Sequence, residues 1–215
     1  MNHYRAVIFD LDGTLLDTLD DLADAVNYAM KAHGYPTHSR EAVCRFVGNG
    51  IRSLIALSLP EGEGNPQFDE VLSTFRSYYG SHSQCKTAPY PGILALLQDL
   101  RGADVRVAVV SNKFDAAVRD LCAHYFGELV EVAVGESPAV PKKPAPDTVL
   151  RAMQLLGVKP AECVYVGDSD VDIKTAQNAG IPCISVLWGF RDRAFLLANG
   201  AQRLAEDVGE LAVLL

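Results

Sequence analysis

Apolar runs of strand length recur along the chain and alternate with segments of helical spacing. The runs lie at residues 5–10, 105–110, 163–166 and 182–187, with a weaker one at 130–134. They are continuous, which is typical of strands buried on both faces of a sheet. Helical spacing fills the intervals, at residues 93–100, 114–125, 148–156 and 173–179. This alternation predicts right-handed crossovers and an α/β, doubly wound parallel sheet, a Rossmann-like core.

The stretch from residue 16 to residue 87 interrupts the alternation. Leu19, Leu22, Val26 and Met30 form one apolar helix face, and further helical patterns follow at 41–47, 51–59 and 68–79. No segment in this stretch has the pattern of a strand. We therefore expect two domains: a core formed by residues 1–15 and 88–215, and a helical cap formed by residues 16–87, inserted after the first strand.

Composition and charge narrow the range of partners. Of the 215 residues, 49% are hydrophobic and 21% charged, as in ordinary soluble proteins. No apolar run reaches the roughly 18 residues of a membrane span, and no signal-peptide pattern opens the chain. The net charge of −8, with no Lys/Arg cluster, argues against nucleic acid. We expect a cytoplasmic protein that acts without nucleic acid or membrane, as a monomer or small homo-oligomer.

Two carboxylates, Asp10 and Asp12, follow the first predicted strand directly and precede Gly13. Ligands of open parallel sheets bind at the carboxyl ends of the strands, where such a pair could supply a nucleophile and a general acid or base. An ordinary Asp-Gly turn is the simpler explanation, and a calcium-binding EF-hand loop is another. The calcium loop is excluded because its sixth and twelfth positions would be Leu15 and Asp21, where glycine and glutamate are required.

A second acidic cluster, Asp168, Asp170 and Asp172, follows the strand predicted at 163–166. One of these residues, or Ser169, could simply cap the next helix. Three crowded carboxylates repel one another unless a cation neutralises them, and magnesium favours one or two carboxylates together with phosphate oxygens. The cluster therefore indicates a metal site.

Two less specific motifs are expected at the same edge of the predicted sheet. Ser111-Asn112 closes the strand at 105–110 and offers a hydroxyl and backbone amides, while Lys143 stands before Pro144 on the approach to a helix. Taken singly, a helix cap and a solvated lysine are the ordinary explanations. Four such features at one edge of one sheet together indicate a single site.

This combination of motifs resembles the haloacid dehalogenase superfamily of phosphatases over nearly the whole chain. The four blocks that match, in order, are Asp10-Leu11-Asp12-Gly13-Thr14, Ser111-Asn112, Lys143-Pro144 and Gly167-Asp168-Ser169-x-x-Asp172. Within the superfamily, the chain is most similar to the phosphoglycolate phosphatase-like branch, which the segments 46–50 and 89–92 also resemble.

The resemblance implies magnesium-dependent hydrolysis of a small phosphorylated metabolite through an aspartyl-phosphate. Asp10 would be the nucleophile and Asp12 the general acid and base. Mg²⁺ would be held by the carboxylates of Asp10 and Asp168 and the main-chain carbonyl of Asp12. Ser111, the amide of Asn112 and Lys143 would bind the phosphoryl oxygens, and Asp172 would hold a metal-bound water or orient Lys143. An acid at position 12 disfavours dehalogenation.

The cap is expected to read the leaving group. Gly48-Asn49-Gly50 would allow close backbone approach, and Arg52 could pair with a carboxylate such as that of phosphoglycolate, although a solvated helix residue is the simpler explanation of Arg52. The alternatives are a β-phosphoglucomutase-like isomerase, a pyrophosphatase and a non-catalytic phosphate-binding module. The presence of both Asp10 and Asp12 argues against the last of these.

Overall fold

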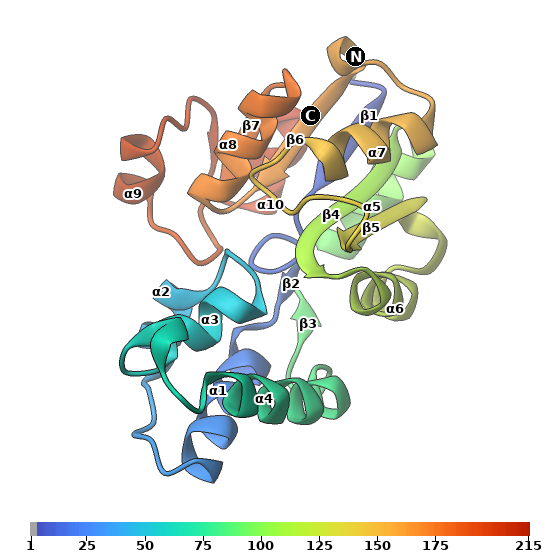
Figure 1. Ribbon diagram of the computed structural model, residues 1–215. Helices are drawn as coiled ribbons and strands as arrows, with labels where there is room; N and C mark the ends of the chain where they lie inside the picture. Colours follow the sequence, from blue (N-terminus) through green and yellow to red (C-terminus); the bar gives the residue numbers. More distant parts are fainter. Residues whose placement is uncertain (1–3) are drawn as a thin grey trace. The chain divides into compact units, whose positions relative to one another are not determined.

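The computed structural model describes residues 4–215, and its central layer is a six-stranded sheet (Figure 1). The strands in spatial order are β5 (Val132–Glu136), β4 (Arg106–Phe114), β1 (Ala6–Phe9), β6 (Cys163–Gly167), β7 (Cys183–Val186) and β8 (Leu204–Ala205). Every neighbouring pair is parallel. The predicted α/β parallel sheet is therefore confirmed. The crossovers leave β1 and β6 in opposite directions, which makes the carboxyl ends of these two strands the topological switch point.

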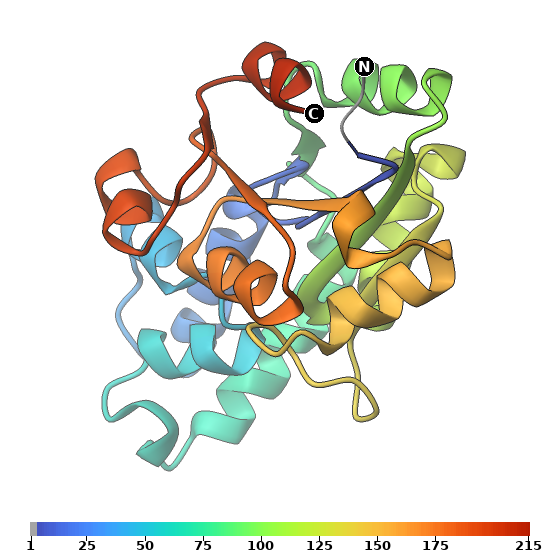
Figure 2. The ribbon, with the colours of Figure 1, turned by 90° about the horizontal axis from the view of Figure 1, so that it is seen from above.

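Helices cover both faces of this sheet (Figure 2). The helices on one face are α5 (Ile93–Gly102), α6 (Asp115–Tyr125) and α10 (Val208–Leu214). On the other face lie α7 (Asp147–Leu156) and α8 (Asp170–Ala179). Val7 and Phe9 of β1 pack in the first layer and Ala6 and Ile8 in the second, all fully buried. Because successive strand residues point to opposite faces, burial on both sides produces the continuous apolar run.

The chain divides into two compact units. The sheet unit ends at Leu16 and resumes with Pro89–Leu215, and the cap unit is Asp17–Ala88. These bounds lie one residue from those expected from the sequence. The helices of the cap unit are α1 (Leu19–Ala32), α2 (Arg40–Phe46), α3 (Ile51–Ser58) and α4 (Phe68–His82). Inside it, Asp21 accepts hydrogen bonds from the backbone amides of Lys86 and Thr87, at 3.0 and 2.9 Å, and so joins the first helix to the end of the unit.

Several elements differ from the prediction. β2 (Leu16–Asp17) and β3 (Ala88–Pro89) form a two-stranded sheet where no strand was expected. β8, α9 (Arg193–Ala198) and α10 were also missed, because two to seven residues are too few to show a period. In addition, β4 continues through Ser111 and Asn112 to Phe114, so these residues lie within a strand. No helix of the described residues is long and apolar enough to cross a membrane.

Candidate active site

The sheet unit brings Asp10, Asp168 and Asp172 together at the switch point. Asp10 follows β1, and its amide donates to the carbonyl of Val166 in β6 at 2.8 Å, so the two strand ends stay side by side. One carboxylate oxygen from each of the three aspartates lies within 4.8 Å of the others, and all three residues are buried. Two motifs separated by more than 150 residues of sequence thus form one acidic cluster.

Lys143 is the cation at the centre of this cluster. Its Nζ lies 2.8 Å from Asp10 Oδ1 and 2.8 Å from Asp172 Oδ1, and it donates to the hydroxyl of Tyr165 at 3.0 Å. The side chain of Lys143 is 3% exposed. Although burial alone would lower the pKa of Lys143, Asp10 and Asp172 raise it. The ammonium therefore stays charged beside Asp10, and a role for it in binding phosphate stays a prediction.

One lysine does not neutralise three buried carboxylates. Burial, and then Asp172, raise the pKa of Asp10 well above its ordinary value, against the opposing effect of Lys143. Burial and Asp172 likewise raise the pKa of Asp168 to about 7. The donors are all oxygen atoms, the type that hard divalent cations prefer. The site therefore fits a divalent cation, which would relieve the repulsion between Asp10 and Asp168.

Both oxygens of Asp172 already have protein partners. Oδ1 accepts from Lys143 and from the hydroxyl of Tyr165 at 2.9 Å. Oδ2 accepts from the amide and hydroxyl of Ser169 at 3.0 and 2.6 Å, as part of a capping box that begins α8. Gly167 allows this approach, because a Cβ there would lie 2.4 Å from Asp172 Cβ. These contacts fix the carboxylate of Asp172 where it can orient the side chain of Lys143.

Asp168 is enclosed by backbone that the sequence analysis did not single out. The amide of Phe190, after β7, donates to Asp168 Oδ2 at 2.6 Å. A Cβ at Gly13 would lie 2.4 Å from that oxygen, and one at Gly189 would lie 2.3 Å from Asp168 Cβ. Trp188 donates from Nε1 to the carbonyl of Thr14 at 3.0 Å. Gly189, two residues after the apolar run at 182–187, was the available signal for this loop.

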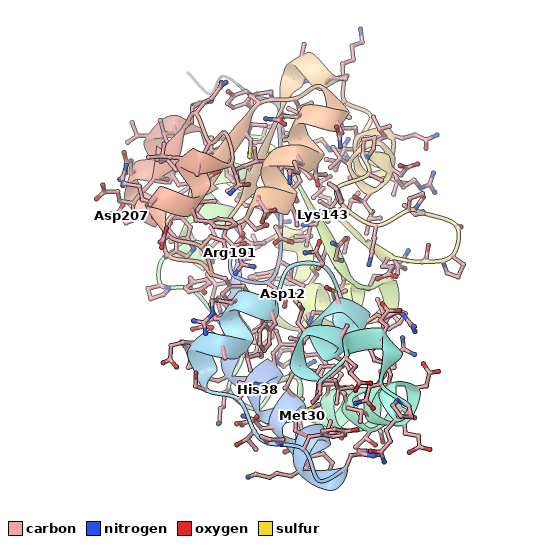
Figure 3. The ribbon with its side chains drawn as sticks, turned by 60° about the vertical axis from the view of Figure 1, so that its left-hand side comes forward. Asp12, Met30, His38, Lys143, Arg191 and Asp207 are labelled. Atoms are coloured by element: carbon pink, nitrogen blue, oxygen red, sulfur yellow. The ribbon has the colours of Figure 1, made fainter. Side chains whose placement is uncertain are left out.

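Asp12 lies beside β4 and is held by two of its residues. Ser111 Oγ donates to Asp12 Oδ2 at 3.4 Å, and Lys113 Nζ lies 3.2 Å from Asp12 Oδ1. Figure 3 labels Asp12 and Lys143, which come from different segments of the sheet unit. Lys113 and Tyr165 are side chains of this site that, like Trp188, the sequence analysis missed. A lysine after Asn112 looks solvated, and a tyrosine in an apolar run looks like core.

The side chain of Asn112 holds the segment that carries Lys143. Its Nδ2 donates to the carbonyl of Lys143 at 3.1 Å, and its Oδ1 accepts from the amide of Lys143 at 2.7 Å. These two bonds fix the backbone of Lys143 against β4. The side chain of Asn112 is thus occupied by these two bonds, and a role for its backbone amide in binding phosphate stays a prediction.

The cap residues named from the sequence belong to the other unit. Gly48 and Gly50 have φ angles of 131° and 82°, a region that favours glycine. The Arg52 guanidinium donates from Nε and Nη2 to Glu63 Oε2, at 3.0 and 2.8 Å, and lies over the ring of Phe68 at 4.6 Å. Its charge is therefore already paired within the cap unit. A role for Gly48, Asn49, Gly50 and Arg52 in reading substrate stays a prediction.

Relatives in sequence are phosphoglycolate phosphatases. A phosphoglycolate phosphatase of Chromobacterium violaceum is 34% identical to the chain over 219 residues, which cover 98% of this chain and 96% of the relative. A phosphoglycolate phosphatase of Aquifex aeolicus is 32% identical and covers 86% of each chain. The resemblance extends over both units.

Relatives in structure have the same fold. A candidate phosphoglycolate phosphatase from Lactobacillus delbrueckii subsp. bulgaricus superposes with a TM-score of 0.94 at 37% identity, covering 98% of both chains. CbbY from Rhodobacter sphaeroides, solved as a mutant with xylulose-(1,5)bisphosphate, superposes with a TM-score of 0.74 at 27% identity, covering 94% and 93%. The family model for haloacid dehalogenase-like hydrolases matches residues 7–186. The chain belongs to the haloacid dehalogenase-like hydrolase family, and its relatives in sequence are phosphatases of that family.

Proposed function

We propose that the protein hydrolyses a small phosphomonoester, 2-phosphoglycolate first among the candidates, with Mg²⁺ as its cofactor. The observation that carries the proposal is the pairing of Asp10 with Lys143 at 2.8 Å inside the acidic cluster, with Asp12 close by on the same loop. A nucleophilic carboxylate, a phosphate-binding cation and a second carboxylate for proton transfer are the parts that hydrolysis through a covalent intermediate requires.

The proposed reaction has two steps. In the first, a carboxylate oxygen of Asp10 bonds to phosphorus, the ester P–O bond breaks, and Asp12 gives its proton to the departing alcohol oxygen. In the second, Asp12 takes a proton from water, whose oxygen bonds to phosphorus while the bond to Asp10 breaks. Inorganic phosphate leaves, and both aspartates return to their starting state. The two steps together consume one water for each ester.

The other residues bind and orient. Lys143 and Ser111 are placed to bind the phosphoryl oxygens, and Asp172 keeps Lys143 in position. The carboxylates of Asp10 and Asp168 and the carbonyl of Asp12 would hold Mg²⁺, which supplies charge neutralisation at the transferring phosphoryl group. A cytoplasmic location, a monomeric or small homo-oligomeric state, and a cap that reads the leaving group stay predictions.

A sugar bisphosphate is the second candidate, because CbbY was solved with xylulose-(1,5)bisphosphate. The test is a panel of phosphate esters, assayed for phosphate release with Mg²⁺ and after exhaustive chelation. We expect 2-phosphoglycolate to have the highest kcat/KM and chelation to abolish turnover. A higher kcat/KM for a sugar bisphosphate would make that compound the preferred substrate in place of 2-phosphoglycolate. Transfer of phosphate back to a sugar would indicate an isomerase. Full activity after chelation would contradict the metal assignment.

A further inference from the structure

Lys113 is a buried lysine beside the proposed general acid. Its side chain is 5% exposed, and its Nζ lies 3.2 Å from Asp12 Oδ1. Burying an ammonium is costly unless it is paired or serves a ligand. The reaction as proposed uses Asp12 for proton transfer and Lys143 for phosphate, and it gives Lys113 no part.

The position of Lys113 matches the position of a carboxylate in a short substrate. In 2-phosphoglycolate a single carbon separates the ester oxygen from the carboxyl group, so a carboxylate oxygen lies about 3 Å from the ester oxygen. Proton transfer requires Asp12 to stand at hydrogen-bond distance, about 2.7 Å, from that same ester oxygen. A cation in contact with Asp12 is therefore within ion-pair reach of a carboxylate on the adjacent carbon.

We propose that Lys113 is a specificity-determining residue that binds the carboxylate of substrates carrying one beside the phosphorylated carbon. The assignment rests on the proposed function, and it places recognition of this anion in the sheet unit. Lys113 directly follows Ser111 and Asn112 on β4, so the same strand would hold the phosphoryl group and the carboxylate. A ligand with both anions would then be bound at two points by one rigid element.

Arg52 is the competing cation, and its surroundings differ. Arg52 is half exposed and paired with Glu63 at 2.8 Å, with Asp69 at 3.7 Å. Lys113 is buried, and the group it contacts is the one that must approach the substrate. Its charge and its contact with Asp12 make Lys113 better suited than Arg52 to bind a small carboxylate.

A structural role and a recognition role predict different kinetics. If Lys113 only holds Asp12 in place, its loss lowers kcat for every alkyl phosphate by the same factor. If it binds the carboxylate, the loss is larger for substrates that have one than for substrates that lack it. A charge-assisted contact implies about a tenfold to hundredfold decrease in kcat/KM, mainly through KM.

The test compares 2-phosphoglycolate with its primary amide, which has nearly the same size but no charge. Lys113→Gln keeps a donor for Asp12 and removes the positive charge, and Lys113→Arg keeps the charge. Lys142→Gln is the matched control, an exposed lysine of the same charge. We expect wild type to prefer the acid, Lys113→Gln to lose about tenfold to hundredfold more kcat/KM on the acid than on the amide, and Lys113→Arg to restore most of the preference. Lys142→Gln should match wild type.

Three results would overturn the assignment. Equal losses on acid and amide in Lys113→Gln would make Lys113 a positioning residue that acts through Asp12. Equal kcat/KM for the two substrates in wild type would show that the carboxylate is not recognised, while the proposed phosphatase activity would stand. This comparison does not depend on whether a variant folds. Hydrolysis of neither substrate by wild type, while other phosphate esters are hydrolysed, would reject the substrate class of the proposed function and Lys113 with it.

Discussion

Replacing Asp168 by asparagine should stabilise the metal-free protein. Asp168 is 1% exposed, and burial, followed by Asp172, raises its pKa from 3.8 to about 7. Because one pKa unit corresponds to about 1.4 kcal/mol, the ionised group costs the metal-free fold up to about 4 kcal/mol at pH 8. Asparagine has no charge to bury, and its carbonyl oxygen can still accept from the amide of Phe190.

The contribution of Asp168 to folding stability changes with pH. The unfolded carboxyl ionises near its ordinary pKa of 3.8 and the folded one only near 7, so between these values the folded protein binds the extra proton. Wild-type stability therefore falls as pH rises through this window and is lowest above it. The gain from Asp168→Asn should be largest at pH 8 and small at pH 4.

Calorimetric unfolding in the presence of a chelator measures this gain. About 2–4 kcal/mol corresponds to a rise in Tm of roughly 5–15 °C for a chain of this size. Added Mg²⁺ should stabilise wild type and leave the variant unchanged, since binding to the folded state alone raises stability. Asp170→Asn, at a partly exposed neighbour, is the control and should change stability by under about 0.5 kcal/mol. A destabilised Asp168→Asn protein at pH 8, or the same gain at pH 4, would refute the reasoning.

Two further substitutions test the packing around the site, and a third tests a helix of the cap unit. Asp172→Ala removes the buried partner of Lys143 and the capping-box partner of Ser169 at the start of α8, and should cost about 3–5 kcal/mol in urea unfolding; a cost near that of Asp170→Ala would show that the pair is not structural. Gly189→Ala should cost about 1–3 kcal/mol and raise the Mg²⁺ requirement, because its Cβ would lie 2.4 Å from the carbonyl oxygen of Gly13; unchanged unfolding would contradict this packing. Gly80→Ala, in α4 with no atom within 4 Å of the new Cβ, should instead stabilise by about 0.5–1 kcal/mol; a loss of stability would contradict that helix environment.

The sequence predicted the sheet and its acidic edge because both depend on local patterns. A strand buried on both faces must be continuously apolar, as Ala6–Phe9 is, and a polar residue that ends it lies at the sheet edge. Asp10 and Asp168 could therefore be placed together without coordinates. The pairing of β1 with β6 was not needed for this inference, because all carboxyl ends of a parallel sheet share one edge.

The groups of the site that could not be predicted act through backbone atoms or long-range contacts, which leave no local pattern in the amino-acid sequence. The amide of Phe190 binds Asp168 through backbone, which every residue possesses. The hydroxyl of Tyr165 reaches Lys143 and Asp172 from the middle of an apolar strand, where only the ring is expected to matter. Lys113 lies in the part of β4 beyond the apolar run, where the pairing of β4 with β5 shifts register. The partners of Arg52 depend on how Glu63 and Asp69 fold toward α3.

The most direct test of the account is the detection of phosphate on Asp10 during turnover. Wild-type enzyme is mixed with 2-phosphoglycolate and Mg²⁺, quenched in acid within one turnover, digested and mapped by mass spectrometry. We predict one phosphorylated peptide, containing Asp10, that forms before free phosphate appears and is absent from Asp10→Asn, which should also show no turnover. Phosphate release by Asp10→Asn at a rate near that of wild type, or phosphate on a different residue, would contradict the central claim.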